Sequence, residues 1–271
     1  MMKSNSNIMF GNKIRGYGRL VFIFFVTTFG FLLVIIVGLL PIGNKYNIGL
    51  KIRKVWSRIC LAILNFQVEV WGQFPKDRNY LFVGNHRSSL DPFVFLSYGV
   101  GNPVSRGDVA KYPLVGKGAV ITGIIFVDKE SKSSRGATKE AIYKALEEGK
   151  SIMIYPEGKT GAQPLTTTFQ KGSFEQAAEL GVPVVPFAIE YENINDYWDH
   201  TDGMLVHYLK YLAKPRTKIR LSIGQPIAAD NAWTLLRQSQ LWVNDEIVKM
   251  RADWGGLAPE IPVKSGKSQV N

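Results

Sequence analysis

Hydrophobic positions are concentrated first in residues 20–40, LVFIFFVTTFGFLLVIIVGLL, which form a run of 21 residues without a charged side chain. An α-helix needs roughly 20 such residues to cross a hydrocarbon core of about 30 Å. The following segment, residues 51–66, mixes basic residues with Val55, Trp56 and other apolar residues, which is typical of an amphipathic helix at a membrane interface. We therefore expect residues 1–70 to form a membrane-embedded helical element, either as a full span or as a hairpin held in the membrane surface.

After Trp71 the pattern changes to short β-rich runs, separated by segments with helical periodicity and by glycine and proline. The expected strands are residues 80–83, 124–128, 151–155, 183–189 and 218–223, and the expected helices are residues 91–98, 135–148, 173–180 and 233–251. Alternating strands and helices predict an α/β fold with a mixed, largely parallel sheet flanked by helices. We expect this domain to cover residues 71–260, and residues 261–271 to form a flexible tail.

The excess of positive over negative charge lies largely in the N-terminal part of the chain. No acidic residue precedes Glu69, whereas nine lysines and arginines do, so the remaining chain carries only +2 of the net charge of +11. A surface for nucleic acid would place its charge on the folded domain, but here the charge flanks the apolar run. The distribution therefore favours an anionic membrane surface as the partner and argues against nucleic acid.

The cysteine and histidine content excludes several kinds of site. Cys60 is the single cysteine, which rules out a disulfide framework and a multi-thiolate metal centre. The three histidines form no cluster with metal-ligand spacing, so no metal site is expected.

Residues 80–95, YLFVGNHRSSLDPFVF, contain a histidine followed five residues later by an aspartate. On a continuous helix the two side chains would lie about 140° apart. His86 and Asp91 can therefore meet only if residues 85–89 form a turn from a strand end into a helix, for which Pro92 suits the first position. In such a turn Asp91 would accept a hydrogen bond from the imidazole and make its second nitrogen more basic; ordinary turn and N-cap residues are the alternative.

A second polar segment follows the expected strand at residues 151–155. The sequence YPEGKT places Glu157, Gly158, Lys159 and Thr160 after the strand. Gly-Lys-Thr also occurs in phosphate-binding P-loops, but that motif requires a glycine at the position of Met153. We therefore expect a strand-ending turn or a site for a hydroxylated ligand at the carboxyl edge of the sheet.

A third segment, residues 107–135, is a loop punctuated by glycine and proline that leads into an apolar strand. Lys111, Lys117 and Lys129 in this segment could bind a phosphate or a carboxylate head group, and solvated surface lysines are the alternative.

Taken together and in order, these segments resemble the glycerolipid acyltransferases of the 1-acylglycerol-3-phosphate acyltransferase type. NHRSSLD resembles the N-H-x4-D signature of that family, and KYPLVGKGAVITGIIFVDK resembles its second block. YPEGKT resembles the F-P-E-G-T-R block, GVPVVPFAI resembles the fourth block, and IRLSIGQPI resembles the strand and turn that close the domain. The resemblance runs from Tyr80 to Ile227, which is more than half of the chain.

The resemblance implies an enzyme that moves a fatty acyl group from an acyl thioester to the free hydroxyl of a lysophospholipid. The donor would be acyl-CoA or acyl carrier protein, acting as a co-substrate without any further cofactor. The expected acceptor is 1-acylglycerol-3-phosphate, giving phosphatidic acid, and the alternatives are lysophosphatidylethanolamine, lysophosphatidylcholine or a lyso-aminolipid. The enzyme would be membrane-bound, with its catalytic domain facing the cytoplasm.

The resemblance also assigns roles to individual residues. His86 would be the general base and Asp91 would orient it. The implied substrate-binding residues are Asn85, Arg87, Lys111, Lys129, Glu157, Gly158, Lys159 and Thr160.

One departure from the family pattern concerns the acceptor. After Glu-Gly the family usually has Thr then Arg, whereas this chain has Lys159 then Thr160. A lysine keeps a positive charge but lacks the bidentate guanidinium fork that suits a phosphate monoester.

Two functions of other classes remain to be weighed. A membrane serine hydrolase would use Ser88 or Ser89 as nucleophile, but no G-x-S-x-G motif is present. A non-catalytic membrane-binding protein would leave the order of the four blocks unexplained.

Overall fold

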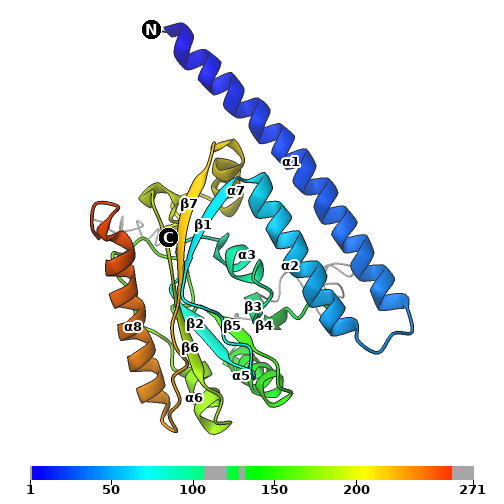
Figure 1. Cartoon of the computed structure of the whole chain (residues 1–271), viewed down its shortest axis with the longest axis vertical. Helices are drawn as coiled ribbons and strands as arrows, with labels where there is room; N and C mark the ends of the chain where they lie inside the picture. The colour runs from blue at the N-terminus through cyan, green and yellow to red at the C-terminus, as the bar shows by residue number, and fades with distance from the viewer. Residues whose placement is uncertain (1, 107–120, 128–131, 258–271) are drawn as a thin grey trace, which may run out of the picture.

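The computed structural model describes residues 2–106, 121–127 and 132–257 (Figure 1). The helices are α1 (Met2–Leu39), α2 (Lys45–Ile63), α3 (Asp91–Leu96), α5 (Lys132–Glu147), α6 (Gly172–Glu179), α7 (Met204–Ala213) and α8 (Ala232–Ala252), with a short 3₁₀ helix η2 (Ile194–Asp196). The strands are β1 (Phe66–Trp71), β2 (Leu81–Gly84), β3 (Asn102–Arg106), β4 (Ile125–Val127), β5 (Ile152–Ile154), β6 (Val184–Tyr191) and β7 (Thr217–Ile223). Every expected strand and helix of the domain is confirmed, with ends that differ by three residues or fewer.

The strands of the described residues form one sheet in the order β1-β7-β6-β2-β5-β3-β4. All neighbouring strands are parallel except β6 and β7, which confirms the expected mixed, largely parallel sheet. β2 and β6 lie in the interior of the sheet, and all their residues are buried because helices cover both faces. β1 pairs with β7, so the sheet begins at Phe66 and the expected domain boundary after residue 70 falls inside a strand.

Two hydrophobic clusters hold helices against the two faces of the sheet (Figure 1). One cluster joins α2, α3 and α7 to side chains such as Phe82 and Phe187 of the sheet. The other joins α5, α6 and α8 to side chains such as Leu81 and Val184. Successive strand residues point to opposite faces, so both faces of each central strand can be apolar.

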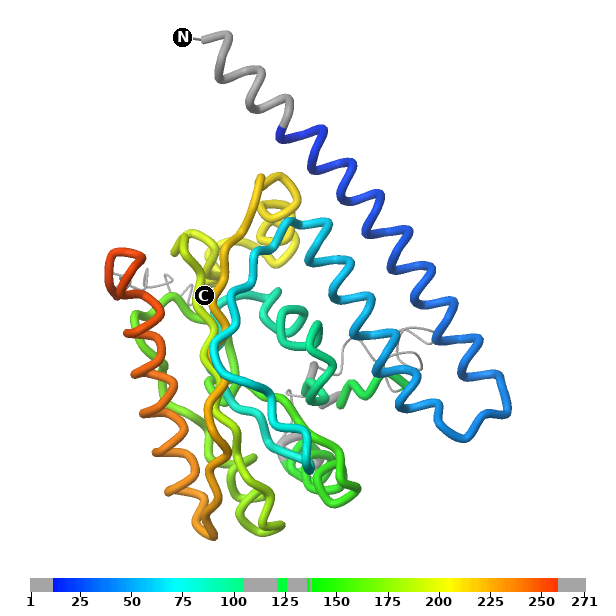
Figure 2. The backbone as a smooth tube through the Cα atoms, viewed as in Figure 1, coloured from blue at the N-terminus to red at the C-terminus, as the bar shows by residue number. Residues whose placement is uncertain are grey.

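The N-terminal helices form an antiparallel pair, with α1 lying along α2 and extending past the sheet (Figure 2). Among the described residues, one helix segment, Asn12–Leu39, is long and apolar enough to cross a membrane. The helix expected after it is confirmed as α2, but one of its basic residues faces the domain. Arg53 is buried and donates to the carbonyl oxygen of Gly101 at 2.7 Å, whereas Val55 is exposed.

Candidate active site

The histidine and aspartate of NHRSSLD lie where a central strand ends. β2 ends at Gly84, the turn follows, and α3 begins at Asp91. A Cβ atom on Gly84 would lie 2.4 Å from the ring of Phe187, so only glycine allows this close approach of β2 to β6. The strand-to-helix turn required for His86 and Asp91 to meet is therefore confirmed.

The two side chains form a direct hydrogen bond. His86 Nδ1 lies 2.8 Å from Asp91 Oδ2, and Asp91 is fully buried whereas 16% of the His86 side chain is exposed. Because an ionised carboxylate can only accept, the proton of a neutral His86 resides on Nδ1 and leaves Nε2 with a free lone pair. No residue of the described ranges hydrogen bonds to Nε2. This imidazole can accept a proton from a ligand.

Asp91 is held in place by three further donors. Its Oδ2 atom accepts hydrogen bonds from the backbone N–H groups of Arg87 at 2.6 Å and Ser88 at 2.8 Å. Its Oδ1 atom accepts a hydrogen bond from the hydroxyl of Tyr191 at 2.6 Å. Burial, together with the negative charge of Asp91, raises the pKa of Tyr191 well above its ordinary value, so this hydroxyl remains a donor. Four hydrogen-bond donors on one carboxylate fix its orientation.

Tyr155 lies against the ring of His86. Its ring is stacked on the imidazole of His86, with centroids 4.0 Å apart and planes 10° apart. An aromatic face at this distance stabilises a cation, so it favours the imidazolium that forms when His86 accepts a proton. Neither Tyr155 nor Tyr191 was predicted as a site residue, although each ends or follows an apolar strand at the same carboxyl edge as His86.

Glu157 joins the His86 turn to a neighbouring loop. Its Oε1 atom accepts the backbone N–H of His86 at 3.0 Å, and its Oε2 atom accepts the N–H and the hydroxyl of Thr167, each at 2.8 Å. Gly158 adopts φ +75°, a left-handed conformation that glycine tolerates best. Both carboxylate oxygens of Glu157 are thus engaged within the protein, and a contact with substrate stays a prediction.

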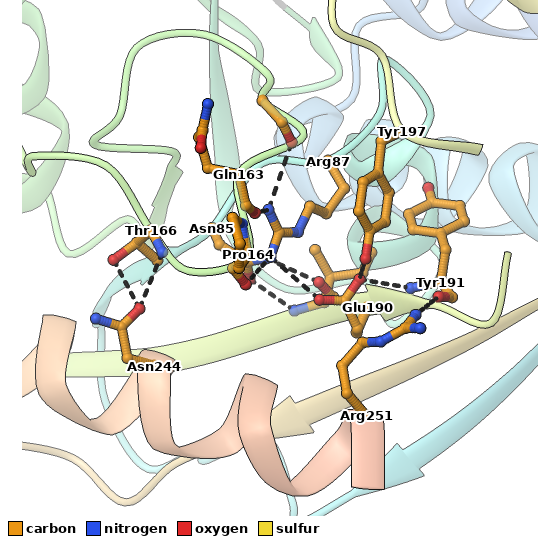
Figure 3. A network of polar contacts seen from close by, with 12 residues as sticks. Asn85, Arg87, Gln163, Pro164, Thr166, Glu190, Tyr191, Tyr197, Asn244 and Arg251 are labelled. Carbon is orange, nitrogen blue, oxygen red and sulfur yellow. Dashed lines mark hydrogen bonds and ion pairs between the residues drawn. The ribbon is translucent and has the colours of Figure 1, made fainter. Parts of the chain in front are cut away.

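Asn85 and Arg87, which the family resemblance assigns to substrate binding, are buried and bonded to the protein instead. The Asn85 side chain is fully buried and exchanges two hydrogen bonds of 2.8 Å with the backbone of Ile189. Arg87 is 2% exposed and pairs with Glu190 at 3.2 Å (Figure 3). The polar atoms of these two residues face the interior, and a contact of either side chain with substrate stays a prediction.

The guanidinium of Arg87 also fixes the loop that follows YPEGKT. It donates to the carbonyl oxygens of Gly161, Gln163 and Pro164, and it lies 4.8 Å from the centre of the Tyr197 ring (Figure 3). Burial alone would lower the pKa of Arg87, but the Glu190 carboxylate raises it above the ordinary arginine value. Arg87 therefore remains charged and serves as the centre of a buried network.

Lys159 and Thr160 occupy different environments. Lys159 is exposed to solvent, whereas Thr160 is buried and its hydroxyl lies 3.0 Å from Nε2 of His200. His200 itself has a left-handed backbone, with φ +67°, and its ring contacts Trp198. The position where the family carries an arginine is therefore filled by a neutral, hydrogen-bonded threonine.

The two serines considered as nucleophiles are poorly placed for attack. Ser88 is fully buried, and its Oγ atom lies 2.9 Å from His207 Nε2 and 3.0 Å from the Tyr211 hydroxyl. The Oγ atom of Ser89 is buried as well. Burial lowers the pKa of His207 to about 4, so His207 is neutral at physiological pH. Burial also raises the pKa of the Cys60 thiol to about 11, so this thiol stays protonated and is a poor nucleophile.

Lys111, Lys117 and Lys129 lie outside the described residues. The expected phosphate-binding role of these lysines therefore stays a prediction.

Comparisons with known proteins decide the family. Residues 65–190 match the family described as Acyltransferase. The chain is 30% identical to a lyso-ornithine lipid O-acyltransferase of Pseudomonas aeruginosa over 74% of its own length and 80% of that protein. The chain belongs to this acyltransferase family. The family resemblance seen in the four sequence blocks is thereby confirmed, and the protein is an enzyme of this class.

Other acyltransferases share parts of the chain. It is 30% identical to a 1-acyl-sn-glycerol-3-phosphate acyltransferase of Borreliella burgdorferi, over 50% of this chain and 56% of that protein. The crystal structure of the 1-acyl-sn-glycerophosphate acyltransferase of Thermotoga maritima has the same fold, with a TM-score of 0.69 over 89% of this chain and 98% of that one, at 20% identity.

Proposed function

We propose that this acyltransferase moves a fatty acyl group from an acyl thioester to a lysolipid hydroxyl, with His86 as general base. The free Nε2 of His86 takes the hydroxyl proton while the hydroxyl oxygen attacks the thioester carbonyl carbon. The C–S bond then breaks, and the departing thiolate takes the proton from the imidazolium. Asp91 orients His86 and stabilises its charged form. The observation that carries this proposal is the hydrogen bond between His86 Nδ1 and a buried carboxylate that has four donors.

The acceptor attacks the thioester directly in this proposal, and no enzyme-bound acyl intermediate forms. The buried oxygens of Ser88 and Ser89 and the buried Cys60 support that route. The donor can be acyl-CoA or acyl carrier protein, since both present the same thioester. Because both donors are cytoplasmic, we place the catalytic domain on the cytoplasmic side.

For the acceptor we favour a lyso-aminolipid, such as lyso-ornithine lipid, over 1-acylglycerol-3-phosphate. A phosphate monoester is best bound by a guanidinium, yet Thr160 replaces the family arginine and Arg87 is already paired with Glu190. An ornithine head group carries both a carboxylate and an amine, so it needs less fixed positive charge. Two relatives aligned over about three quarters of this chain, from Rhizobium meliloti and Pseudomonas aeruginosa, are named lyso-ornithine lipid O-acyltransferases.

A panel of acceptors tests this proposal. The purified full chain, in lipid vesicles with a labelled acyl thioester, should transfer label to lyso-ornithine lipid with a higher kcat/KM than to 1-acylglycerol-3-phosphate or lysophosphatidylethanolamine. A preference for 1-acylglycerol-3-phosphate would overturn the choice of acceptor but leave the chemistry intact. Release of free fatty acid without transfer to any lysolipid would indicate a hydrolase and overturn the proposed function.

The double substitution Lys159→Thr/Thr160→Arg should shift the acceptor preference. It restores the family order and offers a bidentate partner, so kcat/KM for 1-acylglycerol-3-phosphate should rise about tenfold relative to lyso-ornithine lipid, as one charge-assisted hydrogen bond allows. Thr160→Ser keeps the hydroxyl and is the matched control. An unchanged preference in the double variant would show that this position does not select the head group.

We further propose that α1 lies in the membrane surface instead of crossing the bilayer. Its large apolar side chains, including Phe22, Phe25 and Phe29, are exposed, yet the helix also packs against α2 and α7. Arg15 donates to the carbonyl oxygen of Ala213 in α7 at 3.1 Å, and Trp56 of α2 donates to the hydroxyl of Thr27 at 3.1 Å. A transmembrane orientation would carry α2 and α7 into the bilayer, so these contacts favour the surface-embedded hairpin.

A further inference from the structure

α7 lies next to the N-terminal part of α1 (Figure 1) and, like α1, carries several exposed apolar side chains. Met204, Leu205, Val206 and Leu209 are all exposed, and Leu205 is 70% exposed. Leu205 and Leu209 are one helical turn apart and so lie on the same face of α7. Exposed aliphatic side chains grouped on one helix face mark a contact surface for an apolar partner.

The opposite face of α7 packs against the site. His207 follows Leu205 by two residues, which is about 200° around the helix, and Tyr211 lies one turn further along the His207 face. Both residues are buried, and both contact Ser88 Oγ in the turn that holds His86. α7 therefore presents its polar aromatic face to the catalytic turn and its aliphatic face outward.

Arginine side chains tie the end of α7 to α1. Arg15 donates to the carbonyl oxygen of Ala213, and Arg19 donates to those of Leu212 at 3.2 Å and Pro215 at 3.4 Å. Cationic groups at the C-terminal end of a helix satisfy its free carbonyl groups and complement its dipole. α7 is thus fixed beside α1, and both helices carry exposed apolar side chains.

We propose that α7 is a second membrane-docking element, with Leu205, Val206 and Leu209 inserted among the lipids next to α1. The partner is the bilayer, because the aliphatic face adjoins the helix that we place in the membrane surface. The inference rests on that membrane association. It places the bilayer against the helix that carries His207 and Tyr211, so the catalytic turn is held directly above the lipid surface.

Fluorescence quenching at single labelled positions tests the docking. Cys60 is the single cysteine, so Cys60→Ala provides a background for an environment-sensitive label at Leu205→Cys or Leu209→Cys in the full chain. Phe25→Cys on α1 is the reference for lipid contact. Val248→Cys on α8, an exposed position on the opposite side of the sheet, is the reference for solvent.

In vesicles of phosphatidylcholine and phosphatidylglycerol that contain brominated lipids, labels at 205 and 209 should be quenched severalfold more than the label at 248. Quenching at 25 with none at 205 and 209 would overturn the docking of α7 while the association of α1 stands. Absence of quenching at 25, 205 and 209 alike would overturn the membrane association itself and the inference with it.

Discussion

Replacing Asp91 with asparagine should lower kcat about 10²-fold without abolishing it. Asp91 Oδ2 faces two backbone N–H groups and His86 Nδ1, so the asparagine must turn its oxygen toward them and its NH₂ toward Tyr191. The Tyr191 hydroxyl can rotate to accept a hydrogen bond from that NH₂ group. The variant therefore keeps the tautomer of His86 and loses only the charge that stabilises the imidazolium.

Two further variants separate charge from orientation. Asp91→Ala removes both the charge and the hydrogen bond that orients His86. It should lower kcat about 10³- to 10⁴-fold, near the upper range for general acid–base catalysis. Tyr191→Phe keeps the Asp91 charge and removes one hydrogen bond to it, so kcat should fall about tenfold. The measurement is single-turnover transfer of a labelled acyl group, with circular dichroism as the check on folding. Equal rates for Asp91→Asn and wild type would contradict the role of the Asp91 charge.

Replacing Arg87 with methionine should lower the free energy of unfolding by about 3–5 kcal/mol, which is the usual cost of leaving one buried charge unpaired. Glu190 is fully buried, and Arg87 is its ion-pair partner. The substitution also leaves the carbonyl groups of Gly161, Gln163 and Pro164 without this donor. For a chain of this size the Tm should fall by roughly 10 °C.

The double variant Arg87→Met/Glu190→Met provides the matched comparison. It removes both charges, so part of the lost stability should return. Arg216→Met changes an exposed arginine and should leave the Tm within about 1 °C of wild type. An Arg87→Met variant as stable as wild type would show that Arg87 is not the centre of the buried network.

Much of the fold could be predicted from the sequence, because short patterns of apolar and turn-forming residues determine where most strands and helices lie. The apolar runs that became β2, β5 and β6 are bounded by glycine, proline or polar residues, and the geometry of His86 and Asp91 required the turn that the structure contains. β1 was not predicted as a strand. Its alternation of Phe66, Val68 and Val70 directly follows the basic amphipathic segment, and we assigned both to the membrane element.

The parts of the site that escaped prediction depend on contacts between distant segments. Next to the proposed general base, Arg87 has the sequence context of a ligand-binding residue, but the direction of its side chain is set by Glu190, which lies 103 positions away in β6. The Ser88–His207 contact joins residues 119 positions apart. α7 was not predicted, because its N-cap is Gly203, which has no side chain to form a cap hydrogen bond, and because its aliphatic face is not buried within the protein.

Acyl transfer by wild type and His86→Ala, measured side by side in vesicles with a labelled acyl thioester and the preferred lysolipid, tests the central claim most directly. His86 Nε2 is the proposed proton acceptor, so His86→Ala should transfer label about 10³-fold more slowly while its circular dichroism spectrum and vesicle binding match those of wild type. A folded, membrane-bound His86→Ala protein that transfers label within tenfold of the wild-type rate would contradict His86 as the general base.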